Sequence, residues 1–286
     1  MAPPMPHVDG VEHHYADVGG VRIHYAEAGA GEPVVLQHGW PQHWWAWRHQ
    51  IPALAERYRV ICPDLRGFGW SDAPPKGYEK AQLADDLIGL LDALGLERVR
   101  YAGHDWGAFV GYLAAFDHPE RFERLAGLAV PPPWREGRPH PSLLVFLTYQ
   151  TLVSSPLAGS LAMRRGLAKT MLKAGRSAGE WTDEELDTFN QVFEQPEYAN
   201  ASVQVYRTFL TKELPAAIRG AYNDKRLTMP ALLLMGWADL LTKSLDEPAY
   251  RKRSDDLRVE RIDGAGHWLP DEKPDEVTRH LLDFFG

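Results

Sequence analysis

The 286-residue sequence lacks several features that identify large classes of protein: cysteine pairs, long apolar runs and the pattern of a signal peptide. It contains a single cysteine, Cys62, so no disulfide can form within the chain, and the apolar residues around Cys62 predict a buried position. No apolar run approaches the roughly 18 to 20 residues of a membrane-spanning helix. The first residues are neither basic nor strongly apolar, so we expect no signal peptide. We therefore expect a cytoplasmic protein that does not span a membrane.

The chain also lacks an excess of positive charge. The chain has 31 lysines and arginines against 39 aspartates and glutamates, which gives a formal net charge of −8, and the basic residues form no cluster. Nucleic acids and anionic membrane surfaces bind basic patches, so we expect neither as a partner. No set of histidines, cysteines and carboxylates has the spacing of metal ligands, and no phosphate-binding loop is present. We expect no metal and no cofactor; the oligomeric state is not predicted.

Segments typical of strands and helices alternate along the rest of the chain. Amphipathic patterns predict helices over 79–94, over 107–117 and at the C-terminus. This alternation predicts an α/β protein with a mostly parallel sheet flanked by helices on both faces. The predicted strands are 21–25, 34–36, 58–61, 99–103, 125–130, 231–235 and 257–262.

One long segment, residues 131–229, breaks this alternation. It has helical patterns and no strand pattern, and proline-rich sequence bounds it at both ends. Thr182 and Glu185 fit a capping box at the start of one of its helices. We predict a core domain of residues 1–130 and 230–286 with an inserted helical cap. The cap would lie over the carboxyl ends of the strands, where open α/β sheets bind ligands.

An aspartate stands at a turn between a predicted strand and a predicted helix, in Gly103-His104-Asp105-Trp106-Gly107. Glycines on both sides permit a tight turn that holds Asp105 strained and exposed, and hydrolases with this turn usually carry serine there. Attack by a carboxylate on an ester would give an anhydride. Attack on a saturated carbon with a leaving group gives an ordinary alkyl ester on the enzyme. Asp105 therefore predicts strained ethers or alkyl halides as substrates.

Over nearly its whole length the chain resembles the α/β-hydrolase superfamily, in which a nucleophile, an acid and a histidine follow one another in the sequence. The resemblance implies the α/β-hydrolase fold, with Asp105 as nucleophile. Asp239, after the strand that starts near 231, would be the acid. His267, in a glycine-rich loop after the last strand, would activate water to hydrolyse the ester on Asp105.

Three nearby residues are weighed against these roles. Asp246 and Asp263 are weaker candidates for the acid, and Asp263 lies too close in sequence to His267 to reach it from another loop. His104, next to the nucleophile, is expected to point away from it across the turn. We therefore expect His104 to be structural.

The segment Gln37-His38-Gly39-Trp40-Pro41 is similar to the family's His-Gly-x-Pro loop. The resemblance implies an oxyanion hole made by two backbone N–H groups, those of Trp40 and Trp106. It also suggests an unusual turn in this loop, with a cis peptide bond at Pro41.

Two tyrosines of the predicted cap resemble the tyrosine pair of soluble epoxide hydrolases. They are Tyr149, followed by Pro156, and Tyr206, followed by Arg207; where the family often has glycine after the proline, this chain has Leu157. Opening an epoxide creates an alkoxide that needs a proton, and a tyrosine hydroxyl, with a pKa of roughly 10, can donate one near neutral pH. The resemblance implies that Tyr149 and Tyr206 bind and protonate the epoxide oxygen.

The related haloalkane dehalogenases share the aspartate nucleophile and often the tryptophan after it, so Trp106 does not separate the families. Many of them have asparagine at the position of Trp40, and fluoroacetate dehalogenases have arginine directly after the aspartate. This chain has neither. The sequence therefore predicts an epoxide hydrolase that converts small apolar epoxides into vicinal diols. A haloalkane dehalogenase is the alternative, and a non-catalytic small-molecule receptor is a third.

Overall fold

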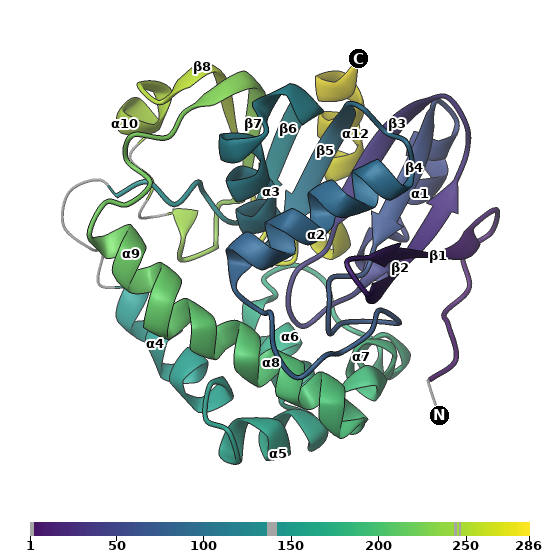
Figure 1. Cartoon of the computed structure of the whole chain (residues 1–286), viewed down its shortest axis with the longest axis vertical. Helices are drawn as coiled ribbons and strands as arrows, with labels where there is room; N and C mark the ends of the chain where they lie inside the picture. Colours follow the sequence, from purple (N-terminus) through teal and green to yellow (C-terminus); the bar gives the residue numbers. More distant parts are fainter. Residues whose placement is uncertain (1–2, 136–141, 243–244, 246) are drawn as a thin grey trace.

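A computed structural model describes residues 3–135, 142–242, 245 and 247–286 of the chain. The strands are β1 (Glu12–Val18), β2 (Val21–Ala28), β3 (Glu32–Gln37), β4 (Tyr58–Pro63), β5 (Val99–His104), β6 (Phe122–Leu128), β7 (Leu227–Gly236) and β8 (Ser254–Ile262). They form an eight-stranded sheet in the order β1-β2-β4-β3-β5-β6-β7-β8 (Figure 1). β2 pairs antiparallel with β1 and β4, and the pairs from β4 to β8 are parallel. The predicted mostly parallel sheet is confirmed.

Helices cover both faces of this sheet. α2 (Lys80–Ala93) and α3 (Trp106–Asp117) pack on one face, and α1 (Ile51–Ala55) and α12 (Pro274–Phe285) pack on the other (Figure 1). Successive strand residues point to opposite faces, so neighbours such as Val34 and Val35 belong to different hydrophobic clusters. The shorter helical segments of the core are η1 (Trp44–Trp47), η2 (Pro119–Arg121), α10 (Glu247–Arg251) and α11 (Leu269–Glu272).

The predicted strands and the three predicted core helices are all present. β1 was not predicted, because its sequence is largely polar and it lies at the edge of the sheet, where most of its side chains stay accessible. β7 begins at Leu227, so the predicted boundary between residues 229 and 230 falls inside this strand. In the described parts of the chain, no helix combines the length and the apolar character that crossing a membrane requires.

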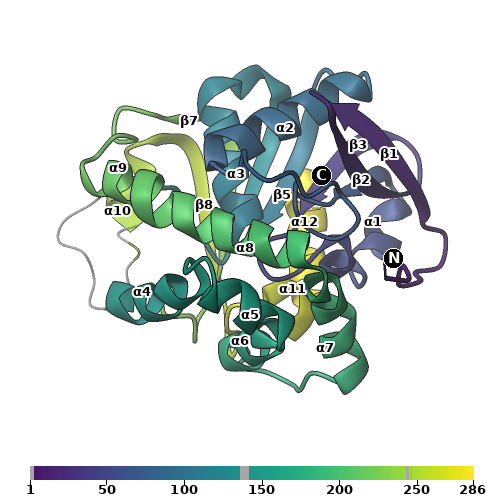
Figure 2. The ribbon, with the colours of Figure 1, turned by 60° about the horizontal axis from the view of Figure 1, so that its bottom comes forward.

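In the described residues between β6 and β7, six α-helices form a separate layer at one edge of the sheet (Figure 1). Figure 2 shows α8, the longest of them, crossing the front of this layer. The division into core and cap remains a prediction. The helices of this layer, with the 3₁₀ turn η3 and the π-helix η4, are α4 (Ser142–Val153), α5 (Ala158–Arg164), α6 (Leu167–Gly175), α7 (Asp183–Asn190), η3 (Gln191–Glu194), α8 (Pro196–Thr208), η4 (Phe209–Glu213) and α9 (Leu214–Ile218).

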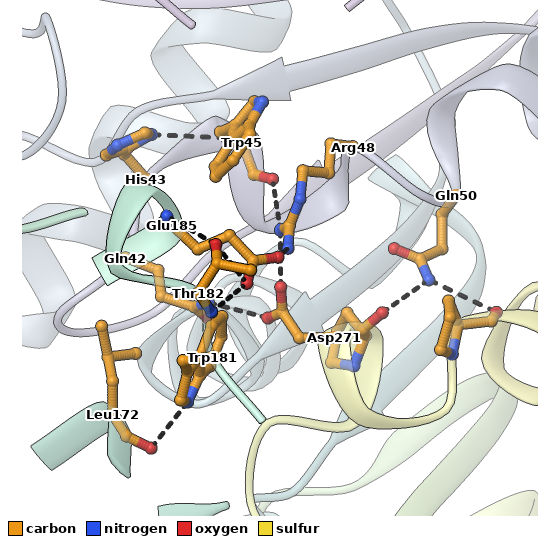
Figure 3. Close-up of polar contacts among 12 residues, drawn as sticks. Gln42, His43, Trp45, Arg48, Gln50, Leu172, Trp181, Thr182, Glu185 and Asp271 are labelled. Atoms are coloured by element: carbon orange, nitrogen blue, oxygen red, sulfur yellow. Dashed lines mark hydrogen bonds and ion pairs between the residues drawn. The ribbon is translucent and has the colours of Figure 1, made fainter. Parts of the chain in front are cut away.

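A buried arginine joins this layer to the core. Arg48, just after η1, donates to Glu185 of α7 and to Asp271 of α11, with nitrogen–oxygen distances of 2.5 Å each (Figure 3). Glu185 also completes the predicted capping box with Thr182. The Arg48 side chain is 8% exposed and that of Glu185 is 22% exposed, so solvent screens these ion pairs less than it screens fully exposed surface pairs. The contact fixes the α7 end of the helical layer.

Candidate active site

Asp105 lies at the sharp turn from β5 into α3. Its backbone has φ 53° and ψ −118°, a strained conformation that few non-glycine residues adopt. The turn is also very tightly packed. A Cβ on Gly107 would lie 2.3 Å from the Gln37 carbonyl oxygen, and one on Gly39 would lie 2.4 Å from the Asp105 Cβ. The glycines therefore let the loop after β3 approach the turn closely enough to contact the Asp105 carboxylate.

Three loops at the carboxyl ends of strands bring Asp105, Asp239 and His267 together. The Nδ1 atom of His267 lies 2.7 Å from Oδ2 of Asp239. Its Nε2 atom lies 3.3 Å from Oδ2 of Asp105. The imidazole thus contacts a carboxylate at each nitrogen, which is the arrangement that orients a histidine for proton transfer.

The other carboxylate oxygen of Asp105 contacts the loop after β3. The backbone N–H of Trp40 donates to Asp105 Oδ1 over 2.8 Å, and the Trp40–Pro41 peptide bond is cis, as predicted. Trp106 opens α3, where the first N–H groups have no carbonyl partner within the helix. The Trp40 amide thus binds the Asp105 carboxylate, and the oxyanion-hole roles of the Trp40 and Trp106 amides remain predictions.

His267 carries a strongly raised pKa. Burial lowers the pKa of this imidazole, but the negative charges of Asp239 and Asp105 and the hydrogen bonds to both carboxylates outweigh burial and raise it to about 10. The histidine is therefore protonated near neutral pH while both carboxylates are charged. Any change that removes the charge of Asp105 lowers the pKa of His267.

Tyr149 of α4 and Tyr206 of α8 meet each other in the site. Their rings pack edge to face, with ring centroids 5.8 Å apart. Burial, and next the charge of Asp105, raises the pKa of Tyr149 to about 12. Burial also raises the pKa of Tyr206 well above its ordinary value, with Tyr149 and Asp105 adding to the shift. Both hydroxyls stay protonated at neutral pH and lie within electrostatic reach of Asp105.

Tryptophan rings hold these tyrosines in place. Tyr206 packs edge-on against Trp40 at 5.0 Å and against Trp106 at 5.5 Å, measured between ring centroids. Tyr149 stacks on Trp40 at 6.2 Å. The indole N–H of Trp40 donates to the Ser202 hydroxyl of α8 over 3.1 Å. The two tryptophans implied as backbone donors thus also use their rings to connect the core to the tyrosine-bearing helices.

The other residues considered from the sequence do not join the contacts among Asp105, Asp239 and His267 in the described structure. Asp263 is exposed, and Asp246 lies outside the described residues. His104 is fully buried, and its Nε2 atom lies 2.8 Å from the backbone carbonyl oxygen of His267. Burial lowers the pKa of His104 to about 4, so it is neutral and supports the His267 loop, as its expected structural role requires.

Glu272 of α11 supports the same loop and was not predicted. Its carboxylate accepts the backbone N–H groups of Gly266 and Trp268, on both sides of His267, over 2.9 and 2.8 Å. It also accepts the N–H groups of Ser177 and Ala178, between α6 and α7, over 2.8 Å each. No local motif marks this residue, because its partners lie in a distant segment and in the turn before it.

Comparison with known proteins places this geometry in a family. The family profile of the α/β hydrolase fold matches residues 32–274. The soluble epoxide hydrolase of Corynebacterium sp. is 32% identical over 96% of this chain and 97% of its own length. The chain belongs to the soluble epoxide hydrolase family. Epoxide hydrolase A of Mycobacterium tuberculosis is 37% identical over 89% of this chain and 92% of its own length.

A solved structure shows the same relationship. The solved structure of the epoxide hydrolase CorEH without ligand superimposes on this chain with a TM-score of 0.85. The two sequences are 31% identical, and the match covers 96% of this chain and 98% of that chain. Within the epoxide hydrolase family, this chain departs from the usual sequence at Leu157. That side chain is 86% exposed, so the departure lies on the surface and leaves Tyr149 in contact with Tyr206.

Proposed function

We propose that Asp105 opens the epoxide ring and that His267, oriented by Asp239, drives hydrolysis of the resulting ester. The chain is an epoxide hydrolase, which converts an epoxide and water into a vicinal diol through a covalent alkyl ester on the enzyme. One observation carries the assignment of roles: the two oxygens of the Asp105 carboxylate have different partners, the Trp40 amide and the His267 imidazole. Water is the only co-reactant that the two steps consume.

The first step forms the ester. Oδ2 of Asp105 attacks an epoxide carbon and breaks its bond to the ring oxygen. That oxygen takes a proton from Tyr206 or Tyr149, whose hydroxyls are protonated and lie near the nucleophile. Oδ1 stays on the Trp40 amide and becomes the carbonyl oxygen of the ester.

The second step returns the enzyme to its starting state. Water attacks the ester carbonyl carbon and gives a proton to His267 Nε2, while the developing oxyanion at Oδ1 is stabilised by the Trp40 amide and by the proposed Trp106 amide. The bond between Cγ of Asp105 and Oδ2 then breaks, and the diol leaves with Oδ2 and the proton of the newly added hydroxyl, so Asp105 is again a carboxylate and His267 is again protonated.

The raised pKa of His267 fits this order of events. In the free enzyme the histidine is protonated because two carboxylates face it. When Asp105 becomes an ester, it loses its charge, and the pKa of His267 falls. The histidine then releases its proton, which restores the tyrosine that was deprotonated in the first step, and acts as a base in the second step. Ester formation thus produces the base that the next step needs.

A single-turnover reaction in ¹⁸O-labelled water tests the assignment. With enzyme in excess over styrene oxide, the diol carries Oδ2 of Asp105 and contains no label, while one labelled oxygen enters Asp105. Mass spectrometry of the diol and of the peptide containing Asp105 measures both. Labelled diol in the first turnover would mean direct attack by water and would refute the ester on Asp105.

Removal of the tyrosine hydroxyls is expected to slow the first step. Tyr206→Phe and Tyr149→Phe should each lower the rate of ester formation by about tenfold or more, and the double variant by about 10² to 10⁴, because an alkoxide then departs without a proton donor. Stopped-flow quenching of tryptophan fluorescence on mixing with epoxide measures this rate.

Tyr198→Phe is the matched control, because Tyr198 lies on the same helix α8 and takes no part in the proposed mechanism. Its rate should equal that of the unmodified enzyme. The alternative activity, haloalkane dehalogenation, predicts the opposite pattern: halide release from bromoalkanes that is little changed by Tyr206→Phe. Full activity of the double tyrosine variant on epoxides would refute the proton-donor role.

The substrate is proposed to be a small apolar epoxide. The rings of Trp40, Trp106, Tyr149 and Tyr206 pack against one another beside Asp105, which supports an apolar environment for the group bound there. The cytoplasmic location and the absence of nucleic acid as a partner remain predictions.

A further inference from the structure

Lys80, the first residue of α2, is completely buried between the core and the helical layer. Its side chain is 0% exposed. A buried ammonium is costly unless it is paired and hydrogen-bonded, so its partners indicate what it does. The proposed chemical steps do not use this residue.

The ammonium group of Lys80 binds the last turn of α8. It donates to the Val205 carbonyl oxygen, which belongs to the peptide unit that leads into Tyr206, and to the Thr208 hydroxyl over 3.0 Å. The Tyr78 carbonyl oxygen is 3.4 Å away. Here α8 passes into the π-helix η4, a form that usually occurs as a short interruption of an α-helix. Lys80 thus binds the backbone next to Tyr206, close to where the α-helix α8 passes into the π-helix η4.

The same ammonium lies over the ring of Trp106. Its nitrogen is 4.8 Å from the ring centroid, within the range of a cation–π contact, and this contact is shielded from water. The Trp106 ring in turn packs against Tyr206. Lys80 therefore contacts both the backbone that carries Tyr206 and the ring that Tyr206 rests on.

The charged groups around Lys80 come from η4 and from the start of α2. Oε2 of Glu213 lies 3.6 Å from the ammonium, and Oε1 of Glu213 accepts the backbone N–H of Lys80 over 3.0 Å. Glu79, the preceding residue, pairs with Lys212 at the surface, over 2.5 Å. The contacts from α3 and α8 are a neutral ring, a carbonyl and a hydroxyl, so Glu213 is the nearest counter-charge in the described structure.

We propose that Lys80 is a positioning residue for the ring-opening step: its ammonium holds the Tyr206 end of α8 against Trp106, so that the Tyr206 hydroxyl stays aimed at the epoxide oxygen. This inference rests on the proposed role of Tyr206 as proton donor. Lys80 acts through Tyr206 and touches neither substrate nor the reacting atoms. Its effect is therefore confined to ester formation and spares ester hydrolysis.

The charge of Lys80 gives this arrangement a dependence on pH. Burial lowers the pKa of Lys80 to about 8, although the charge of Glu213 opposes the shift. Below about pH 8 the ammonium is intact. Above it the neutral amine binds the Val205 carbonyl more weakly and loses its cation–π contact. Ester formation should therefore slow as the pH rises through about 8.

The test compares Lys80→Met with Lys212→Met in the full-length enzyme. Lys212 is on η4, is 60% exposed, and its loss should change nothing. Lys80→Met should slow ester formation about tenfold, leave ester hydrolysis unchanged, and abolish the decline above pH 8. Rapid-quench measurement of the ester with styrene oxide separates the two steps. Equal slowing of both steps, or an unchanged alkaline decline, would overturn the proposal.

A double-variant comparison tests whether Lys80 acts through Tyr206. In a Tyr206→Phe background, Lys80→Met should have less than about a twofold effect on ester formation, because the hydroxyl that it positions is gone. An undiminished tenfold effect would show that Lys80 acts by another route. If Tyr206→Phe alone leaves the rate unchanged, the proton-donor role of Tyr206, on which this inference rests, fails; if it slows the rate but Lys80→Met does not, only the role of Lys80 fails.

Glu213→Gln provides a second measurement should Lys80→Met fold poorly. Glutamine keeps an oxygen for the backbone N–H of Lys80 and removes the negative charge that raises the lysine pKa. The alkaline decline of ester formation should therefore move to lower pH. A decline at the unchanged pH in Glu213→Gln would assign it to another group and overturn the pH dependence proposed for Lys80.

Discussion

A His267→Gln enzyme is expected to react once with an epoxide and then stall as the ester on Asp105. Ester formation needs the carboxylate and the tyrosines, and these remain. Hydrolysis of the ester needs a base for water, and losing one costs about 10² to 10⁴ in rate. A burst of one equivalent of consumed epoxide should precede very slow diol formation. Intact-protein mass spectrometry should show the enzyme heavier by the mass of one epoxide molecule.

The control is His118→Gln, since the His118 side chain is 43% exposed and lies at the far end of α3. That enzyme should turn over normally and carry no stable adduct. If His267→Gln formed no ester at all, His267 would be required in the first step and its assignment to the second would be wrong. If it turned over at the normal rate, another group would have to be the base.

Asp105→Asn is expected to lose both ester formation and the raised pKa of His267. Asparagine keeps the shape of the turn and is among the residues that tolerate positive φ, but it lacks the carboxylate nucleophile, so activity should fall by at least about 10⁴-fold. The charge and hydrogen bond of Asp105 help to raise the pKa of His267 to about 10. Without them the pKa should fall, which an NMR titration of the His267 ring measures.

Asp263→Asn is the matched control, because it neutralises an exposed carboxylate close in sequence to His267. It should leave both the activity and the His267 titration unchanged. A His267 pKa that stays at about 10 in Asp105→Asn would show that Asp239 alone sets it. The proposed fall in pKa on ester formation would then lose its basis, while the nucleophile assignment would still depend on the activity.

The turn around Asp105 could be predicted because its requirements are local. Positions 103 and 107 need glycine because a Cβ there would clash with backbone atoms, and both glycines stand within two residues of Asp105 in the sequence. The positions of Asp239 and His267 followed from their order after successive strands. Tyr149 and Tyr206 were found through resemblance to a family, because each alone is an ordinary residue of an amphipathic helix.

Lys80 and Glu272 could not be predicted, because each has essential partners that lie far away in the sequence. A lysine at the first position of a helix normally faces solvent, and Lys80 is enclosed by groups from α8, η4 and α3. Glu272 stands beside other charged residues, and nothing local indicates that its carboxylate accepts N–H groups from residues 177 and 178. Long-range contacts of this kind appear only in the folded chain.

The contacts of Glu272 determine what happens when the helical layer of this protein is replaced by that of another epoxide hydrolase. Because one carboxylate binds both the His267 loop and the segment between α6 and α7, the helical layer supplies part of the support of His267, the proposed general base. The backbone N–H of His267 also donates to the Gly175 carbonyl oxygen at the end of α6, over 2.9 Å. A helical layer transplanted from a relative to change the substrate would bring its own version of this support. The substrate range and the rate of ester hydrolysis would therefore change together.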